Sequence, residues 1–233
     1  MGSNFIAKDI GFENSASPEK GQAVALMVQS DMSIFYNCQI EGHRATLNAH
    51  SYRQFYRDCT ISGTMDFIFG DAAGVFQNCK LVIRKPNEGQ ECSITAQERT
   101  VHKEATGSIF HNCTIGADPL AQPKCKAYLG RPSKKFSKVI VLQSLLDDSI
   151  APEGWMPWMG NFSQDTCTFV EYENRGPGAM ETGRVKWPGV KKIPIQEAVE
   201  LTPGRFLGGD HWIAPTLVPY KSGLLHVERF KDP

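Results

Sequence analysis

The sequence predicts an all-β fold, a parallel β-helix, and three observations support this prediction. Four segments in the first half share an aromatic–x–Asn/Asp–Cys pattern. Most successive motifs lie between 20 and 23 residues apart, a spacing too short for repeats of paired helices and suited to one solenoid coil per repeat. Around each motif, apolar and polar residues alternate, and Ile, Val, Thr, Phe and Tyr are frequent, as in strands.

The repeat defines the expected coils in chain order. The motifs occupy residues 35–38, 56–59, 76–79 and 110–113, and residues 12–15 fit with Ser in the Cys position. Successive Ser or Cys positions are separated by 23, 21, 20 and 34 residues. Strands of neighbouring coils lie about 4.8 Å apart, so Ser15, Cys38, Cys59 and Cys79 should stack as a ladder of small residues.

The chain has seven cysteines. Three of them, Cys38, Cys59 and Cys79, belong to this ladder, and Cys113 belongs to the fourth motif; the others are Cys92, Cys125 and Cys167. No Cys-x-x-Cys pair occurs, so neither a structural zinc site nor any other metal is expected. Stacked thiols inside a coil pack as small apolar residues. Adjacent coils are also close enough for a disulfide, and the sequence leaves both possibilities open.

A second column is expected seven positions after each ladder residue. It contains Gln22, Ala45, Asp66 and Pro86. Asp66 stands in an apolar run closed by glycines, Gly63-Thr-Met-Asp-Phe-Ile-Phe-Gly70. Burial of a carboxylate there requires a cation or hydrogen bonds. Asp66 is therefore either a structural turn residue or a catalytic group.

Composition excludes several classes of protein. The chain of 233 residues is 41% hydrophobic with no net charge, which excludes a disordered chain and argues against nucleic-acid binding. No apolar run has membrane-spanning length, and no signal peptide is apparent, so we expect a cytosolic protein or one without its natural N-terminus. No phosphate-binding loop or Gly-x-Ser-x-Gly motif appears, and no cofactor is expected.

Several motifs together resemble the plant pectin methylesterases (pectinesterases). They are Gln22-Ala-Val-Ala-Leu26, Gly63–Gly70, Ile94-Thr-Ala-Gln97, Tyr128-Leu-Gly-Arg-Pro132, Gly154-Trp-Met-Pro-Trp158 and Thr202-Pro-Gly-Arg-Phe206. The likeness runs in order from Asn4 to about Pro219. It implies the C-terminal part of a catalytic domain, without its first coils, and a right-handed parallel β-helix of the pectin-lyase-like type.

The resemblance also implies an activity and its residues. Family members hydrolyse methyl esters of homogalacturonan, the backbone of pectin, to carboxylates and methanol. Asp66 corresponds to the nucleophile. Arg131 corresponds to the residue that keeps this carboxylate ionised and oriented, and Gln22 corresponds to an oxyanion-hole donor.

Four positions depart from the family pattern. Where the family has Tyr-Gln-Asp-Thr-Leu, this chain has His43-Arg-Ala-Thr-Leu47, so Ala45 replaces the general acid and Arg44 the second oxyanion donor. Arg44 cannot donate a proton near neutrality but can bind a carboxylate. His43 is a proton shuttle only if it faces the site. Ser133 replaces a tryptophan that offers a surface to a sugar.

Further residues are candidates for substrate binding. Phe67, Trp155 and Trp158 are possible sugar platforms or ordinary packing residues, with packing favoured for Trp158 over Trp155. Every charged side chain between residues 119 and 146 is basic. This basic run is either a solvated loop or a surface for a polyanion. Its members are Lys124, Lys126, Arg131, Lys134, Lys135 and Lys138.

Three hypotheses for function follow. The chain is a pectin methylesterase weakened by Ala45, an inactive relative that binds pectin through Arg44 and the basic run, or a truncated product without function. We expect one domain over residues 1–233, with a C-terminal extension from about residue 176. By resemblance, the protein is a secreted monomer of the plant cell wall whose partners are pectin and a proteinaceous pectinesterase inhibitor, with no nucleic acid or membrane.

Overall fold

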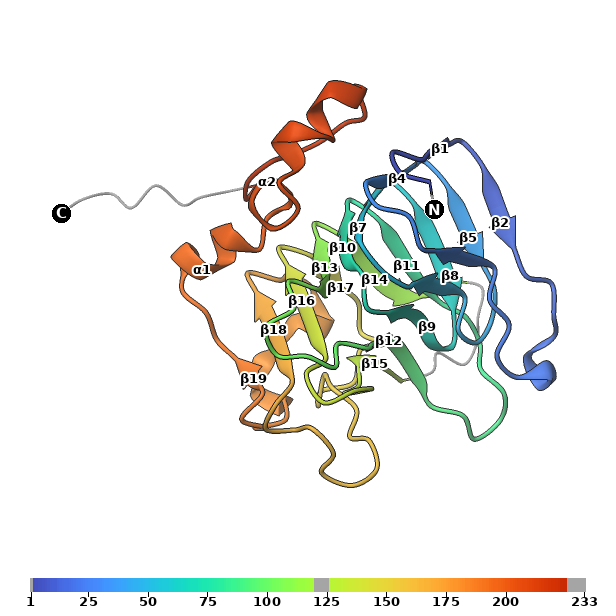
Figure 1. Cartoon of the computed structure of the whole chain (residues 1–233). Helices are drawn as coiled ribbons and strands as arrows, with labels where there is room; N and C mark the ends of the chain where they lie inside the picture. The colour runs from blue at the N-terminus through green and yellow to red at the C-terminus, as the bar shows by residue number, and fades with distance from the viewer. Residues whose placement is uncertain (1, 120–125, 226–233) are drawn as a thin grey trace.

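The computed structural model describes residues 2–119 and 126–225; Lys124 and Cys125 lie outside them. The chain winds into a solenoid whose strands form three parallel sheets (Figure 1). The eight-stranded sheet contains β1 (Ile6–Lys8), β4 (Ser33–Tyr36), β7 (Arg53–Arg57), β10 (Ala73–Gln77), β13 (Gly107–His111), β16 (Lys138–Leu142), β18 (Thr168–Tyr172) and β19 (Val190–Lys191). All-parallel pairing over successive coils confirms the predicted parallel β-helix.

Two further sheets complete each coil. The six-stranded sheet contains β2 (Gly11–Glu13), β5 (Gln39–Glu41), β8 (Thr60–Gly63), β11 (Lys80–Ile83), β14 (Thr114–Ala117) and β17 (Leu145–Leu146). The five-stranded sheet contains β3 (Leu26–Val28), β6 (Leu47–Ala49), β9 (Met65–Gly70), β12 (Cys92–Gln97) and β15 (Ala127–Gly130). This last sheet carries the candidate site.

Stacked side chains fill the interior of the solenoid. The aromatic residue of each repeat lies over its counterpart, and ring centroids are 5.0 Å apart for Phe35 and Tyr56, 4.5 Å for Tyr56 and Phe76, and 4.8 Å for Phe76 and Phe110. These rings are at most 1% exposed. The repeat in the sequence is thus a repeat of core positions, since the same slot recurs in every coil.

The cysteines of the four motifs form the expected ladder. Cys38, Cys59, Cys79 and Cys113 are buried free thiols, and each Sγ donates to backbone carbonyl groups, as Cys59 does to Phe35 over 3.3 Å. These four pack as small core residues and form no disulfide. Burial raises the pKa of the Cys79 thiol well above its ordinary value.

The start of the ladder was predicted wrongly. Phe12 pairs with Ile40 rather than with Phe35, so residues 12–15 do not occupy the motif slot. Since Gly11 pairs with Gln39, Ile10 lies opposite Cys38 in place of Ser15. The aromatic residue of 12–15 fills the aliphatic position of its coil, which the sequence pattern could not distinguish from the aromatic one.

The second column is also less regular than the spacing predicted. Gln22 pairs with Arg44, one position before Ala45. Met65 pairs with Ser93, so Pro86 lies in the connection between β11 and β12 and not beside Asp66. The interval of 34 residues between Cys79 and Cys113 comes from longer connections, and fixed offsets fail wherever a connection changes length.

The C-terminal part of the chain first adds a last strand to the eight-stranded sheet and then leaves this sheet. β19 pairs with β18, and the following segment crosses the outer face of the eight-stranded sheet (Figure 1). It contains α1 (Ile195–Glu200), α2 (Pro203–Phe206) and the short 3-10 turns Gly209–His211 and Ala214–Thr216. Leu207 and Ile213 pack there against outward-facing residues such as Phe55 and Ile109.

A polar row fastens the end of the described chain to the same sheet. Gln77 accepts a hydrogen bond from the backbone N–H of Lys221 and donates to its carbonyl oxygen, over 2.9 and 2.8 Å. Gln143 accepts one from the N–H of Leu225 over 2.9 Å. His111 lies between the two glutamines. No helix in the described part of the chain is long and apolar enough to span a bilayer.

Candidate active site

Asp66 is placed by an irregularity in β9. Met65 pairs with Ser93 and Ile68 with Thr95, so two residues of β9 oppose one residue of β12. Asp66 has a left-handed backbone, with φ of 52°. A bulge of this kind redirects a side chain, and bulges are frequent beside active sites. Gly63, before β9, allows Phe67 to approach the backbone closely, because a Cβ at position 63 would lie 2.2 Å from the Cβ of Phe67.

Arg131 follows β15 directly, and Gly130 lets the two strands approach. A Cβ at Gly130 would lie 2.0 Å from the Thr95 Oγ1, which instead donates to the Leu129 carbonyl oxygen over 2.8 Å. The Arg131 N–H donates to the Thr95 carbonyl oxygen over 3.1 Å. The glycine of the Leu-Gly-Arg-Pro motif thus positions the arginine after it.

Asp66 and Arg131 form a nearly buried, bidentate ion pair. Nε and Nη2 of Arg131 donate to the two carboxylate oxygens over 2.9 and 2.8 Å, and the side chains are 6% and 10% exposed for Asp66 and Arg131, respectively. The guanidinium carbon also lies 3.7 Å from the centre of the Trp158 ring. The carboxylate is therefore fixed in orientation, and a cation–π contact holds its partner.

A cleft of about 490 Å³ opens beside this pair. We call it the Arg44 cleft; it is lined by Arg44, Met65, Gly89, Gln90, Glu91, Met156, Pro157 and Trp158. It borders the site through Met65, which precedes Asp66, and through Trp158, which covers Arg131. Its volume lies within the usual range of ligand pockets, about 300–1,000 Å³.

The remaining predicted catalytic positions lie just before strands β3 and β6 of the same sheet. Gln22 and Arg44 pair through their backbones, and the Ala45 N–H donates to the Met65 carbonyl oxygen over 3.1 Å. Ala45 has the same left-handed backbone as Asp66, with φ of 58°. The Gln22 side chain is exposed, and Ala45 is 3% exposed. The fold brings these residues together although they come from separate coils.

Two predicted sugar platforms are corrected by the structure. Phe67 and Trp155 are fully buried in the core, and the Trp155 ring stacks on Phe169 with centroids 4.4 Å apart. Neither ring offers a face to a ligand. The prediction that favoured packing for Trp158 is wrong, because this ring lines the cleft. Alternation around Gly154–Trp158 could not show which tryptophan points inward. Ser133 is half-buried just beyond Arg131.

The basic run divides among different environments. Lys126, Lys134 and Lys135 are exposed. Arg131 belongs to the ion pair with Asp66. Lys138 lies on β16, 5.1 Å from the centre of the Phe206 ring, and burial lowers its pKa to about 8. The described part of the run is thus no uniform cationic surface.

Two further features bear on the chemistry of the site. Glu91 is the one carboxylate among the described residues that line the Arg44 cleft. No motif marks this residue, because it lies in the connection between β11 and β12. His43 is half-buried, and its pKa is lowered by burial and by Arg84. Within the described residues, no group of His, Cys, Asp and Glu could hold a metal ion.

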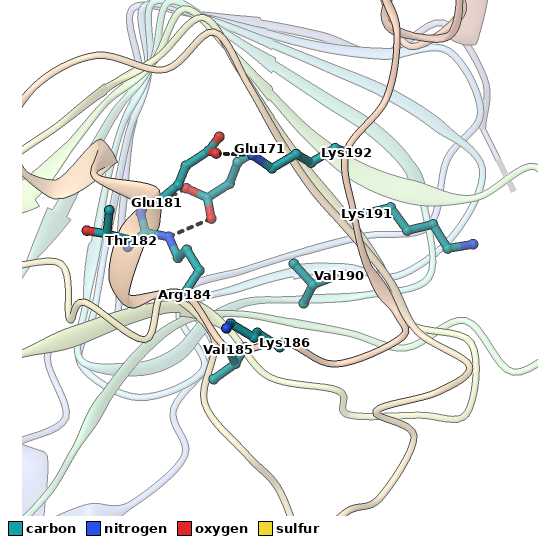
Figure 2. Close-up of a pocket in the computed structure, with 9 residues that line it drawn as sticks. All are labelled: Glu171, Glu181, Thr182, Arg184, Val185, Lys186, Val190, Lys191 and Lys192. Atoms are coloured by element: carbon teal, nitrogen blue, oxygen red, sulfur yellow. Dashed lines mark hydrogen bonds and ion pairs between the residues drawn. The ribbon is translucent and has the colours of Figure 1, made fainter.

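A second pocket, of about 270 Å³, lies far along the solenoid, beside β18 and β19 (Figure 2). Arg184 points toward Glu171 at its side and forms a two-armed ion pair over 2.7 and 2.9 Å. Arg184 also donates to the carbonyl oxygens of Pro152 and Gly178, over 3.0 and 2.5 Å. Arg184 thus joins β18 to the segments around Pro152 and Gly178, and we assign these contacts a structural role.

The fold and site define a class. A three-sheet solenoid with a carboxylate–guanidinium pair and an aromatic ring at a cleft on one face is suited to an extended ligand lying along its surface. A family model described as Pectinesterase matches residues 1–210. The chain belongs to the pectinesterase family, as its motifs predicted.

Individual relatives agree with this assignment. The chain is 54% identical to "Probable pectinesterase/pectinesterase inhibitor 23" of Arabidopsis thaliana over 222 residues, which are 94% of this chain and 39% of that protein. It is 49% identical to a Petunia integrifolia pectinesterase over 232 residues, 97% of this chain and 62% of that protein. It thus spans less than two thirds of either relative.

A solved structure supports the fold. Carrot pectin methylesterase superposes with a TM-score of 0.93 at 44% identity, covering 96% of this chain and 72% of that chain. The likeness confirms the right-handed parallel β-helix expected from the family resemblance.

Proposed function

We propose that the chain binds methyl-esterified homogalacturonan on the five-stranded sheet and hydrolyses its methyl esters slowly, with Asp66 as nucleophile. The observation that carries the proposal is the Asp66–Arg131 pair beside the Arg44 cleft. The bulge in β9 orients the carboxylate, and Arg131 balances its charge in a nearly buried setting. A fixed carboxylate of this kind can attack an ester carbonyl carbon to form an acyl-enzyme.

The residues around Asp66 have complementary roles in this reaction. Attack by a carboxylate oxygen forms the new C–O bond and places a negative charge on the former carbonyl oxygen. Gln22 and Arg44, adjacent through their backbone pairing, supply N–H donors to that oxyanion. The C–O bond to the methoxy group then breaks, and the leaving methoxide takes up a proton to become methanol. Water afterwards hydrolyses the acyl-enzyme and restores Asp66.

Proton transfer is the weak step of this mechanism. Ala45 has no group that can give a proton to methoxide or remove one from water, so solvent must do both. A positioned acid–base group contributes about 10²- to 10⁴-fold in rate. We therefore expect a turnover number lower by roughly this factor than that of relatives with aspartate at this position.

Methanol release from highly methylated homogalacturonan tests the proposal. The wild-type chain should release methanol slowly, and Asp66→Asn should release none above the buffer rate. Circular dichroism and thermal unfolding of both proteins check that the fold is retained. Equal release by wild type and a folded Asp66→Asn protein would remove Asp66 from the mechanism.

The setting of the protein is part of the same proposal. From family membership, we propose that the protein is secreted to the plant cell wall, which contains its polymer substrate, pectin. We also propose that it acts as a monomer. The names of Arabidopsis relatives combine pectinesterase with pectinesterase inhibitor, which supports a proteinaceous inhibitor as a partner. Size-exclusion chromatography with and without an inhibitor domain tests both points.

A further inference from the structure

Arg44 is a cation without a counter-ion at the wall of the cleft. Its side chain makes no hydrogen bond or ion pair with other described residues, and its Nε is buried without a partner. Arg131 and Arg184, in contrast, each have a bidentate carboxylate partner. A buried donor left unpaired costs free energy. Such a group in a ligand cleft points to an acceptor supplied by the ligand.

The charge of the site differs from the pattern of the family. By the motif resemblance, glutamine and aspartate are the family pattern where this chain has Arg44 and Ala45. The first replacement adds one positive charge and the second removes one negative charge, so the local charge changes by two units toward positive. An aspartate repels a substrate carboxylate, whereas a guanidinium attracts it and can bind it with two hydrogen bonds. A methyl ester, being neutral, gains much less.

The other groups at the cleft are compatible with a uronic acid. The Trp158 ring provides an aromatic face, Met65 and Met156 provide apolar walls, and Gln90 provides a neutral polar group. Glu91 is the opposing charge, but its side chain is exposed, and water and salt screen exposed charges more than buried ones. Near Arg44 the balance favours an anion.

We propose that Arg44 binds the free carboxylate of a galacturonate residue, so that the Arg44 cleft prefers de-esterified homogalacturonan to its neutral ester. This inference rests on the proposed function for the identity of the polymer and adds its charge state. It makes the reaction product a better ligand than the substrate. The protein would then remain bound to stretches of pectin that have already lost their methyl groups.

Equilibrium binding of two non-hydrolysable oligomers tests the preference. One is an oligogalacturonate, and the other is the same oligomer with every carboxylate converted to a neutral amide. For the wild-type chain, the oligogalacturonate should bind about 10- to 100-fold more tightly, the range of a charged hydrogen-bonded pair. The difference should shrink at high salt concentration.

Variants assign the preference to one residue. Arg44→Gln should bind both oligomers alike, and Arg44→Lys should keep part of the preference through its charge. Arg205→Gln, which removes the same charge from an exposed position on α2, should behave as wild type. Equal binding of the two oligomers by the wild-type chain, or an unchanged preference in folded Arg44→Gln, overturns the proposal.

The result is independent of turnover, because neither oligomer contains an ester. Preference for the oligogalacturonate without methanol release from methylated polymer would contradict the proposed activity and support the proposed ligand. Methanol release without a preference for the oligogalacturonate would support the proposed activity and contradict the proposed ligand. Absence of both would reject both proposals.

Discussion

Arg131 donates from two nitrogens to the two carboxylate oxygens of Asp66, and the pair is almost excluded from solvent. Removal of one partner from a buried pair leaves an uncompensated charge, which costs about 3–5 kcal/mol. We expect Arg131→Met to lower the free energy of unfolding by about this amount. Urea denaturation followed by circular dichroism measures it.

A double variant separates the stranded charge from lost packing. Arg131→Met with Asp66→Asn removes both charges, and it should be more stable than Arg131→Met alone. If the second substitution restores no stability, the loss arises from the contact of Arg131 with Trp158 and not from the ion pair.

Restoration of an aspartate at position 45 should increase activity. Ala45 has φ of 58°, and Asp66 adopts φ of 52° in the next coil. Aspartate tolerates this left-handed conformation better than most residues, so Ala45→Asp requires no change of backbone. We expect methanol release to rise about 10²- to 10⁴-fold, the contribution of an acid–base group.

Ala45→Asn is the matched control for that change. Asparagine has the same size and also tolerates a left-handed backbone, but it neither gives nor takes a proton near neutrality. Its activity should stay at the level of the wild-type chain. An equal rise in both variants would assign the effect to shape and would contradict the role of a missing acid.

The sequence predicted the repeating part of this molecule better than its exceptions. The stack of Phe35, Tyr56 and Phe76 and the thiol ladder follow from one motif, since a fixed period places equivalent residues in one column. Predictions failed where the period changed, at residues 12–15 and at Pro86. The bulge at Asp66 could not be predicted either, because it depends on how β9 meets β12.

The candidate site shows the same division. Motif resemblance singled out both Asp66 and Arg131, and the structure pairs them. The motif resemblance could not show which of Trp155 and Trp158 points into the core, because the direction of a side chain next to a turn depends on the conformation of the turn. The unpaired state of Arg44 and the presence of Glu91 in the cleft depend on three-dimensional packing alone.

His111 should make the fold sensitive to acid. It is fully buried, and burial is the main cause that lowers its pKa from 6.5 to about 4. Between these values, the unfolded chain binds a proton that the folded chain does not, so stability falls as pH falls from about 6.5 to about 4. A shift of this size corresponds to at most about 3 kcal/mol.

Denaturation with urea at pH 7 and at pH 4.5 measures this effect. Gln77 Nε2 donates to His111 Nδ1 over 3.1 Å, so Nε2 of the neutral ring carries the hydrogen and faces Gln143. His111→Gln retains hydrogen-bonding ability without a titrating ring. Its loss of stability between the two pH values should be smaller than that of wild type, and an identical loss would place the sensitivity elsewhere.

The thiol ladder should be unreactive in the folded protein. Cys79 and Cys113 are at most 1% exposed, and only a thiolate is a good nucleophile. We expect no rapid modification of these residues by a thiol reagent at pH 8 without denaturant, and complete modification in urea. Mass spectrometry of the digested protein assigns the modified positions. Rapid labelling of Cys79 in the native state would show that the coils open locally.

The pair of Arg184 and Glu171 should stabilise the last coils of the solenoid. Its side chains are 7% and 9% exposed, and Arg184 also binds carbonyl oxygens of two neighbouring segments. Arg184→Gln should therefore cost about 3–5 kcal/mol of unfolding free energy, because Glu171 stays buried without a cation. The nearby pair of Lys192 and Glu181 is 86% and 52% exposed, so Lys192→Gln should cost far less, because water screens an exposed pair. If the two variants were equally stable, burial would not govern the strength of these pairs.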